Sequence, residues 1–253
     1  MPNLTILHTN DLHGKLRPEG VETIRRAKES SGECLLLDAG DAVTSGNIYY
    51  RPGGEPALAR MSEAGYDAMA MGNREFHFLK PGLHSKVKLA RFPVLCANIH
   101  GAEDAIGPSI RRSITMVRGG YRVALFGLTV PMITRKMLAS KVSPYWFDDP
   151  IHAAREIVPD LRIQADVIIA VTHIGSKLDE TLAQEVPGID LIVGGHTHSV
   201  LDEPVRIGNT SIVQAGWFAH YLGRVEITGE PGSLSIEGCL LPLQSARTKG
   251  SAP

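Results

Sequence analysis

The stretch "LTILHTNDLHG" (residues 4–14) decides the expected fold. Residues 4–9 are mainly apolar and β-branched, as in a β-strand, and Asp11 and His13 follow directly. In open α/β sheets, ligands bind in the loops beyond the carboxyl ends of the strands. A strand that ends in acidic and imidazole side chains therefore predicts an α/β protein with a site at the edge of a sheet.

Short apolar runs alternate with helical patterns along the rest of the chain, which is typical of a layered α/β fold. Several of the runs are apolar at every position, as in central strands that are covered on both faces. Further strands are expected at 33–39, 66–71, 92–98, 166–172 and 190–194. Helices are expected at 20–30, 55–64, 150–165 and 178–186, the third with Pro159 as a kink.

Two more segments are typical of β-hairpins. Residues 113–129 contain two adjacent glycines as a turn, and residues 210–243 form a β-rich end with a turn at 229–232. The chain thus has two groups of strands rather than one doubly wound sheet. We expect a single domain over 1–245 and a frayed tail over 246–253.

The bulk properties exclude several classes of protein. Of the 253 residues, 43% are hydrophobic and 21% are charged, which is typical of a globular chain and excludes a disordered one. The net charge of −1 gives no basic stripe for extended nucleic acid, so a nuclease is the weakest of the interpretations. No apolar run is long enough to span a membrane.

The N-terminus and the cysteines bear on the compartment. "MPNLTILHTND" lacks the features of a signal peptide, so a cytoplasmic protein is expected unless a longer natural precursor carries an export signal. Cys34, Cys96 and Cys239 suggest neither a zinc site nor a disulfide framework, and we expect all three to be buried. Both observations favour a reducing compartment.

Polar side chains recur where the expected strands end. Asp41 follows the second strand in "DAGD", and Asn73 follows the third in "MGN". His173 ends a strand in "VTH", and "GGHTH" places His196 and His198 after the next. Each motif alone is common in turns and loops, but their occurrence at successive strand ends predicts a metal site.

The donor types indicate which metals the site takes. Carboxylate, imidazole and amide donors together suit transition metals better than Ca²⁺ or Mg²⁺, which favour all-oxygen shells. Two divalent ions are expected, because seven donors exceed what one ion needs. Mn²⁺ and Zn²⁺ come first, with Fe, Co or Ni as alternatives. His8, on the first strand, is expected to be a core histidine.

Eight motifs occur in a characteristic order: "ILHTNDLHG", "DAGD", "GYDAMAMGNREF", "FPVLCANI", "GLTVP", "VTHIG", "IDLIVGGHTH" and "VQAGWFAHYLGRV". Over about residues 4–229 they resemble the catalytic domain of the calcineurin-like metallophosphoesterases, in the branch of 5′-nucleotidases and 2′,3′-cyclic nucleotide phosphodiesterases. The resemblance implies a four-layer αββα sandwich with two mixed β-sheets. It also implies a small, nucleotide-like phosphate ester as the substrate.

The resemblance implies two metal positions, with Asp41 bridging them. The first metal would be held by Asp11, His13, Asp41 and His198. The second would be held by Asp41, Asn73, His173 and His196. Asp38 is not among the ligands, and we expect it to orient one of them.

The chain departs from this family at the general acid. The family has "GNHE" and an Asp two residues later; its His protonates the leaving oxygen and the Asp orients that His. Arg74 and His77 stand at those positions in "MGNREFHF", beside Asn73. Catalytic roles are expected for these three residues. Arg74 keeps its proton and would stabilise phosphate charge, whereas His77 is a replacement donor only if its loop lets it reach inward.

A second departure concerns substrate recognition. The family's nucleotidases stack the base on aromatic side chains of a C-terminal domain, whereas only 55 residues (199–253) follow His198. Stacking would then come from the loops 47–54 or 143–149, or from a partner chain. Aromatic side chains in such loops are at least as often local packing anchors.

These features predict a dinuclear-metal phosphoester hydrolase. Without the usual acid it is expected to favour diesters, aryl esters or anhydrides, whose leaving groups need a proton least. The alternative is a catalytically weak or inactive module that binds a nucleotide or phosphate through its metals without cleaving it.

Overall fold

One mixed sheet carries the first strand of the chain near its middle. In spatial order its strands are β15 (Ser233–Pro242), β14 (Tyr221–Glu230), β1 (Asn3–Thr9), β2 (Cys34–Asp38), β3 (Ala68–Ala70), β4 (Val94–Leu95) and β6 (Ile110–Arg111). The strands from β1 to β6 run parallel, and the late hairpin β14–β15 joins them through an antiparallel pairing of β14 with β1. In this computed structural model, residues 3–244 are described.

The second sheet is also mixed. Its strands, in order, are β12 (Val205–Ile207), β13 (Thr210–Val213), β11 (Leu191–Val193), β10 (Val167–His173), β8 (Tyr121–Thr129) and β7 (Ser113–Arg118). The four central strands are parallel, whereas β7 and β12 pair antiparallel at the two edges. A small separate ladder joins β5 (Ile99–His100) to β9 (Trp146–Phe147).

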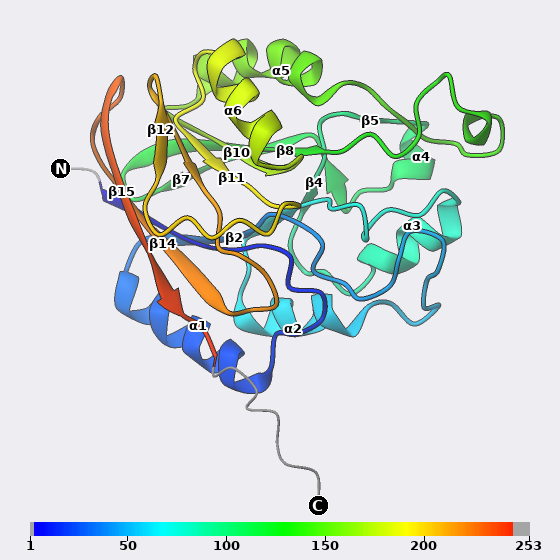
Figure 1. Cartoon of the computed structure of the whole chain (residues 1–253), viewed down its shortest axis with the longest axis horizontal. Coiled ribbons are helices and arrows are strands. Elements are labelled where there is room, and N and C mark those ends of the chain that lie inside the picture. The colour runs from blue at the N-terminus through cyan, green and yellow to red at the C-terminus, as the bar shows by residue number, and fades with distance from the viewer. Residues whose placement is uncertain (1–2, 245–253) are drawn as a thin grey trace, which may run out of the picture.

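Helices cover the outer face of each sheet (Figure 1). On the first sheet lie α1 (Pro18–Ser31) and α2 (Pro56–Ala64), and on the second lie α5 (Pro150–Gln164) and α6 (Ser176–Glu185). The helices α3 (Lys80–Val87) and α4 (Glu103–Ile106) and the 3₁₀ turn η1 (Leu138–Lys141) complete the described elements. The expected four-layer αββα sandwich with two mixed sheets is confirmed.

The side chains of β1 show how the sequence gives these layers. Leu4 and Ile6 point between the two sheets, where they pack against buried residues of both. Leu7 lies on the opposite face and packs under α1 with Ile24. All three are fully buried, as a central strand covered on both sides requires. The polar residues after Thr9 therefore begin where this buried stack ends.

The structure differs from the expected elements where periodicity is weak. Helix α3 was not expected, because its buried face includes Gly82, Ser85 and Lys86 rather than an apolar stripe. The expected strand 92–98 shrinks to β4, since the chain turns away after Leu95 to form β5. Helix α5 runs on through Pro159.

Two further expectations concern the cysteines and the tail. Cys34 and Cys96 are buried, but Cys239 is exposed, so the expectation for it was wrong. The reason is that β15 is an edge strand whose exposed and half-buried residues alternate. The expected frayed tail lies outside the described residues. Within residues 3–244, none of the helices has the length and apolarity to cross a membrane.

Candidate metal centre

The first group of donors comes from the turns after β1 and β11. His13 Nε2 lies 3.2 Å from His198 Nε2. Asp11 Oδ1 lies 3.7 Å from the same atom of His13 and 3.2 Å from that of His198. Carboxylate and imidazole donor atoms thus converge on one point. The imidazole of His198, 39% exposed, opens this group to solvent.

The second group combines buried and exposed donors, since His173 and Asp41 are buried whereas His196 is exposed. His173, at the end of β10, lies with Nε2 3.2 Å from Asn73 Oδ1 and 3.4 Å from Asp41 Oδ1. His196 Nδ1 lies 3.3 Å from the same His173 nitrogen. Asp41 and Asn73 follow β2 and β3, so this group joins the first sheet to the second.

The two groups adjoin each other, so the structure brings all seven expected ligands to one rim. Donor atoms of Asp11, Asp41 and His173 lie within 4.8 Å of one another, as do those of Asp11, His13 and His198. The backbone N–H of His196 also donates to Asp11 Oδ2 at 2.9 Å. Asp11 is the carboxylate common to both triads, whereas the family resemblance assigns the shared position to Asp41.

The backbone at these donors is strained. Seven non-glycine residues among those described have positive φ, and five of them are expected ligands. Those five are Asp11, His13, Asp41, His196 and His198. Left-handed backbone costs an ordinary residue about 1–2 kcal/mol, and such residues cluster at functional sites. The strain aims side chains from tight turns at one point, which a relaxed loop would not do.

Glu75 holds the turn of Asp41 and was missed in the sequence. Its carboxylate accepts hydrogen bonds from the backbone N–H groups of Asp41 (2.9 Å), Gly72 (2.9 Å) and Val43 (3.1 Å). Burial, and then the nearby charge of Asp41, raise the pKa of Glu75 to about 7. A β-carbon on Gly72 would lie 2.2 Å from Asp41 N, so the two turns approach as closely as they do only with glycine there.

Asn10 and Asp38 form hydrogen bonds that hold the turns carrying Asp11 and Asp41. Asn10 Nδ2 donates to Asp11 Oδ2 at 2.8 Å and to the carbonyl of Gly216, and it too was missed in the sequence. Asp38, expected to orient a ligand, accepts from Thr9 Oγ1 and from Gly40 N. It therefore acts on the backbone turn before Asp41, through Gly40. Burial raises the pKa of Asp38 well above its usual range.

The imidazoles are prepared to offer a lone pair. His173 Nδ1 lies 2.7 Å from the carbonyl of Ala39, so this nitrogen carries the proton and Nε2 faces the other donors. Burial is the largest cause that lowers the pKa of His13 and of His196, which keeps both rings neutral. Asp11 Oδ1 is buried and accepts no hydrogen bond from residues 3–244. A neutral nitrogen set around an unsatisfied carboxylate oxygen fits a divalent metal ion.

Arg74 lies at the rim and His77 does not. The backbone N–H of Arg74 donates to Asp41 Oδ1 at 2.8 Å, and its Nε lies 3.4 Å from Asp41 Oδ2. The ring of His77 is buried between Tyr50 and Phe78, and Leu79 N donates to its Nδ1 at 3.0 Å. The structure therefore places His77 at the start of α3, where it stabilises the backbone, and not among the donors.

The two loops expected to offer aromatic side chains for stacking, 143–149 and 47–54, differ in the exposure of those side chains. In loop 143–149, Tyr145 and Phe147 are buried, and the indole of Trp146 stacks on His100 at 5.5 Å with Arg135 4.3 Å from the ring centre. These are packing anchors. In loop 47–54, by contrast, Tyr49 is 59% exposed.

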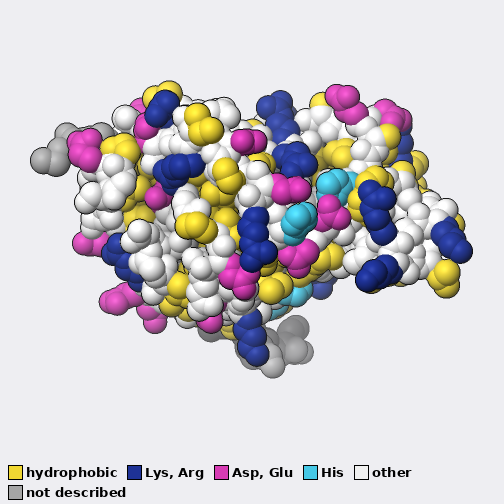
Figure 2. All heavy atoms as spheres, turned by 90° about the horizontal axis from the view of Figure 1, so that it is seen from above, with side chains coloured by type: hydrophobic (Ala, Val, Ile, Leu, Met, Phe, Trp, Pro, Cys, Tyr) yellow, Lys and Arg dark blue, Asp and Glu magenta, His cyan; other side chains and the backbone are white. Residues whose placement is uncertain are grey.

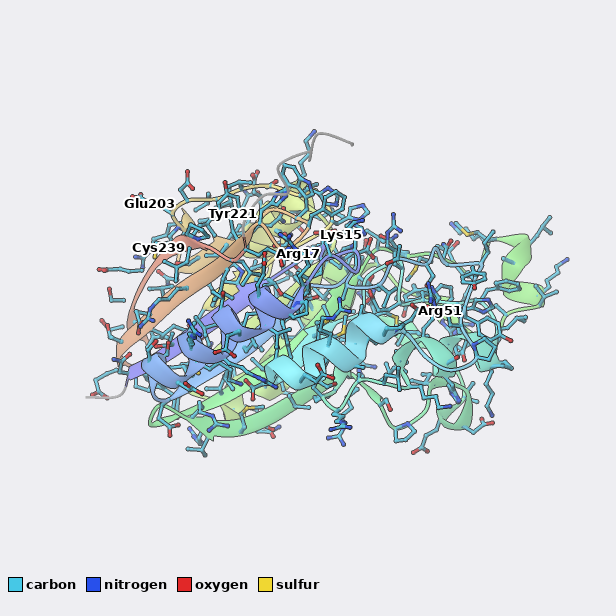
Figure 3. The ribbon with its side chains drawn as sticks, turned by 90° about the horizontal axis from the view of Figure 1, so that it is seen from below. Lys15, Arg17, Arg51, Glu203, Tyr221 and Cys239 are labelled. Carbon is cyan, nitrogen blue, oxygen red and sulfur yellow. The ribbon has the colours of Figure 1, made fainter. Side chains whose placement is uncertain are left out.

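An aromatic pair that was not expected from the sequence, Trp217 and Phe218, borders the first donor group. Trp217 stacks on the His198 ring at 5.8 Å, and Phe218 meets the ring of His13 edge-on at 5.4 Å. Phe218 N donates to the carbonyl of Asp11 at 2.9 Å, so the pair is fixed to the first turn. Lys15, labelled in Figure 3, comes from the connection before α1 and lies over the Phe218 ring at 5.9 Å. The quoted "VQAGWFAHYLGRV" contained this signal.

The family follows from the fold, the site and a direct comparison. A family model described as calcineurin-like phosphoesterase matches residues 4–200. The match covers most of the chain, and the chain belongs to the calcineurin-like phosphoesterase family. The expected family is confirmed.

Curated relatives carry nucleotide-related names. The chain is 32% identical over 265 residues to the trifunctional nucleotide phosphoesterase protein YfkN of Bacillus subtilis, covering 89% of this chain and 18% of that protein. It is 31% identical over 278 residues to a 5′-nucleotidase of Vibrio cholerae, covering 92% of this chain and 50% of that protein. The chain thus spans half or less of the length of these relatives.

Solved structures share the architecture. A 5′-nucleotidase precursor from Thermus thermophilus superposes with a TM-score of 0.80 at 28% identity, over 95% of this chain and 54% of that chain. A calcineurin-like phosphoesterase structure of YfkN from Bacillus subtilis gives a TM-score of 0.73 at 20% identity, over 96% of this chain and 91% of that one. The second likeness concerns the fold alone.

Proposed function

We propose that the chain hydrolyses small, nucleotide-like phosphate esters with the help of two divalent metal ions. The observation that carries the proposal is the convergence of seven donor side chains from both sheets on one rim. The relatives named as a nucleotide phosphoesterase and a 5′-nucleotidase support the substrate class. On the face in Figure 2, acidic and basic side chains are interspersed, which gives no support to a nuclease.

The donors divide between two ions, for which Mn²⁺ and Zn²⁺ are the first candidates. The first ion would be held by Asp11, His13, Asp41 and His198. The second would be held by Asp41, Asn73, His173 and His196. When bound, such ions polarise a phosphoryl oxygen and make a water molecule nucleophilic at neutral pH.

The chain's own residues determine which esters it cleaves. Arg74 can pair with phosphate oxygens through two N–H groups and stabilise the charge that grows in the transition state. It cannot protonate a leaving alkoxide, because a guanidinium keeps its proton at neutral pH. His77 is not brought to the rim. Aryl diesters, aryl esters and anhydrides, whose leaving groups need little protonation, are therefore the preferred substrates.

A substrate screen tests this function. Bis(p-nitrophenyl) phosphate, a phosphoanhydride and 5′-AMP are compared with Mn²⁺, with Zn²⁺ and with a chelator. We expect turnover of the aryl diester to exceed that of 5′-AMP by roughly 10²-fold, the scale of a missing general acid. Equal turnover of 5′-AMP would show that another group supplies the proton. Protein that holds two equivalents of Mn²⁺ but cleaves none of them contradicts the proposal.

Variants at 74 and 77 separate the two residues. Arg74→Ala should lower turnover of the aryl diester, whereas His77→Asn should leave the leaving-group preference unchanged. Arg74→His should raise turnover of 5′-AMP only together with His77→Asp, which restores the orienting carboxylate of the family. A rise with Arg74→His alone would mean that no orienting partner is needed.

A second function is favoured by the contact between Arg74 and Asp41. An arginine on a ligand carboxylate is suited to a module that binds a nucleotide without cleaving it. Calorimetric binding of 5′-AMP, with no product by chromatography after prolonged incubation, would establish this function instead.

A further inference from the structure

Arg74 engages both carboxylate oxygens of Asp41. Its backbone N–H donates to Oδ1 at 2.8 Å and its Nε lies 3.4 Å from Oδ2. The Asp41 side chain is only 6% exposed, whereas that of Arg74 is 36% exposed. A positive charge therefore sits between solvent and a carboxylate that is assigned to metal binding.

The arginine is held in this place from two sides. Arg74 Nη1 donates to the carbonyl of Thr44 at 2.8 Å. The ammonium of Lys86, a fully buried residue, donates to the carbonyls of Arg74 and of Gly46, the latter at 2.7 Å. These bonds tie the loop after Asp41 to the loop after β3. The backbone of Arg74 is thus held in place, while its guanidinium rests on the Thr44 carbonyl and on Asp41.

The two donor triads differ in their dependence on Asp41. Without Asp41, the first position still keeps the converging triad of Asp11, His13 and His198, whereas the triad of Asp11, Asp41 and His173 loses a member. A cation at Asp41 competes for the donor oxygens of the second triad. It also repels a divalent ion there, and at a few ångströms this repulsion exceeds the thermal energy even at the dielectric constant of water.

We propose that Arg74 is a built-in counter-ion of Asp41 that weakens the second metal position, so that the centre fills in two separate steps. The inference rests on the dinuclear site of the proposed function. Entry of the second ion displaces the Arg74 guanidinium from Asp41. The displaced group is then free to take the phosphate of a substrate, so a fully loaded centre and a competent Arg74 arise together.

Calorimetric titration of the chelator-treated full chain with Mn²⁺ tests this without any assay of activity. We expect two steps, the second at least tenfold weaker than the first, which is about 1.4 kcal/mol. Arg74→Ala should strengthen the second step at least tenfold and the first much less, because the first position has three other donors. Arg74→Lys, which keeps the charge, should keep the second step weak.

A matched control removes the same charge from a neighbouring loop. Arg51, labelled in Figure 3, pairs with Glu55 at 3.7 Å, and Arg51→Ala should leave both steps unchanged. Arg74→Gln replaces Arg74→Ala if thermal unfolding shows the latter to be misfolded. Two equal steps in the unmodified chain, or a second step that Arg74→Ala does not strengthen, would overturn the inference and leave the metal centre standing. Failure of Mn²⁺ to bind at all would overturn both.

Discussion

The two donor groups differ in surroundings more than in chemistry. The first borders Trp217 and Phe218 and opens to solvent through His198. The second joins the two sheets, with His173 fully buried and His196 exposed, and adjoins Arg74 through Asp41. Both groups reach solvent through an imidazole, so exposure does not separate them. The fixed charge of Arg74 beside Asp41 is the difference on which the proposed order of loading rests.

Of all the changes, loss of Asp41 should alter metal binding at the two donor groups most. Asp41→Asn removes the negative charge from the second group and from the contact with Arg74. We expect activity to fall more than about 10²-fold, with at least one metal equivalent lost, whereas His13→Ala should lose mainly the first ion. Elemental analysis after gel filtration measures this. Two metals retained by Asp41→Asn would point to Asp11 as the bridge, in line with its place in both triads.

Gly72→Ala should damage the second group more than the first. The added carbon would lie 2.2 Å from Asp41 N and 2.7 Å from Glu75 Oε2, so the turn must shift. We expect a loss of about 1–3 kcal/mol in the free energy of unfolding, as for other overpacked sites, and a weaker second metal step.

Gly53→Ala is the matched control for this change, because a β-carbon there meets nothing within 4 Å. Denaturant unfolding and Mn²⁺ titration are measured on both variants. A first metal step that weakens as much as the second in Gly72→Ala would show that the two groups are not independent.

Lowering the pH should destabilise the sheet that carries the first group through His8, which is not one of the expected metal ligands. Burial lowers the pKa of His8 from 6.5 to about 4. Because the unfolded chain binds the proton that folded His8 refuses, stability is lost as the pH falls from 6.5 towards 4 and is unaffected above 6.5. Between pH 7 and pH 5 this contributes roughly 2 kcal/mol, from about 1.36 kcal/mol per pKa unit.

His8→Gln should remove that part of the pH dependence, whatever its effect at pH 7. The control is His152→Gln, since His152 is exposed on α5 and its loss should leave the slope as it was. Denaturant midpoints at both pH values, on metal-free protein, decide the point. An unchanged slope in His8→Gln would place the acid sensitivity elsewhere.

The change in Trp217 fluorescence is the smallest of the expected effects, but it reports most directly which ion binds first. The chain has two tryptophans, and Trp146 is stacked away from the donors, so Trp146→Phe leaves Trp217 as the reporter. Because Trp217 stacks on His198, we expect its fluorescence to change by some tens of per cent with the first Mn²⁺ equivalent and little with the second. A change confined to the second equivalent would reverse the order of loading.

The sequence predicted the layers, and the edge at which the expected donors lie, for one physical reason. A buried strand must be apolar, so the polar residues that follow it, such as Asp11 and His173, mark where the strand reaches the rim. Helix α3 was not predicted from the sequence, because a buried lysine and a glycine interrupt its apolar pattern.

The supports of the site could not be predicted in the same way. Glu75 acts on backbone N–H groups of another loop, and Asn10 bonds a carbonyl 206 positions away. Such partners are defined by the approach of distant turns and carry no local pattern. His77 shows the converse: it stands where the family has its orienting Asp and was considered as a replacement donor if its loop reached inward, but the start of α3 turns its ring into the protein.

The pairing of β1 with β14 has a consequence for folding of the chain during its synthesis on the ribosome. Residues 3–8 pair with residues 223–228, and the carbonyl of Asp11 accepts a hydrogen bond from Phe218 N. During synthesis, β1 therefore has one edge open until β14, more than 200 residues later, has been made. Closing so long a loop is slow, and an open apolar edge attracts other chains. The nascent chain is therefore vulnerable to aggregation until β14 has paired, although all seven expected ligands precede β14 in the chain.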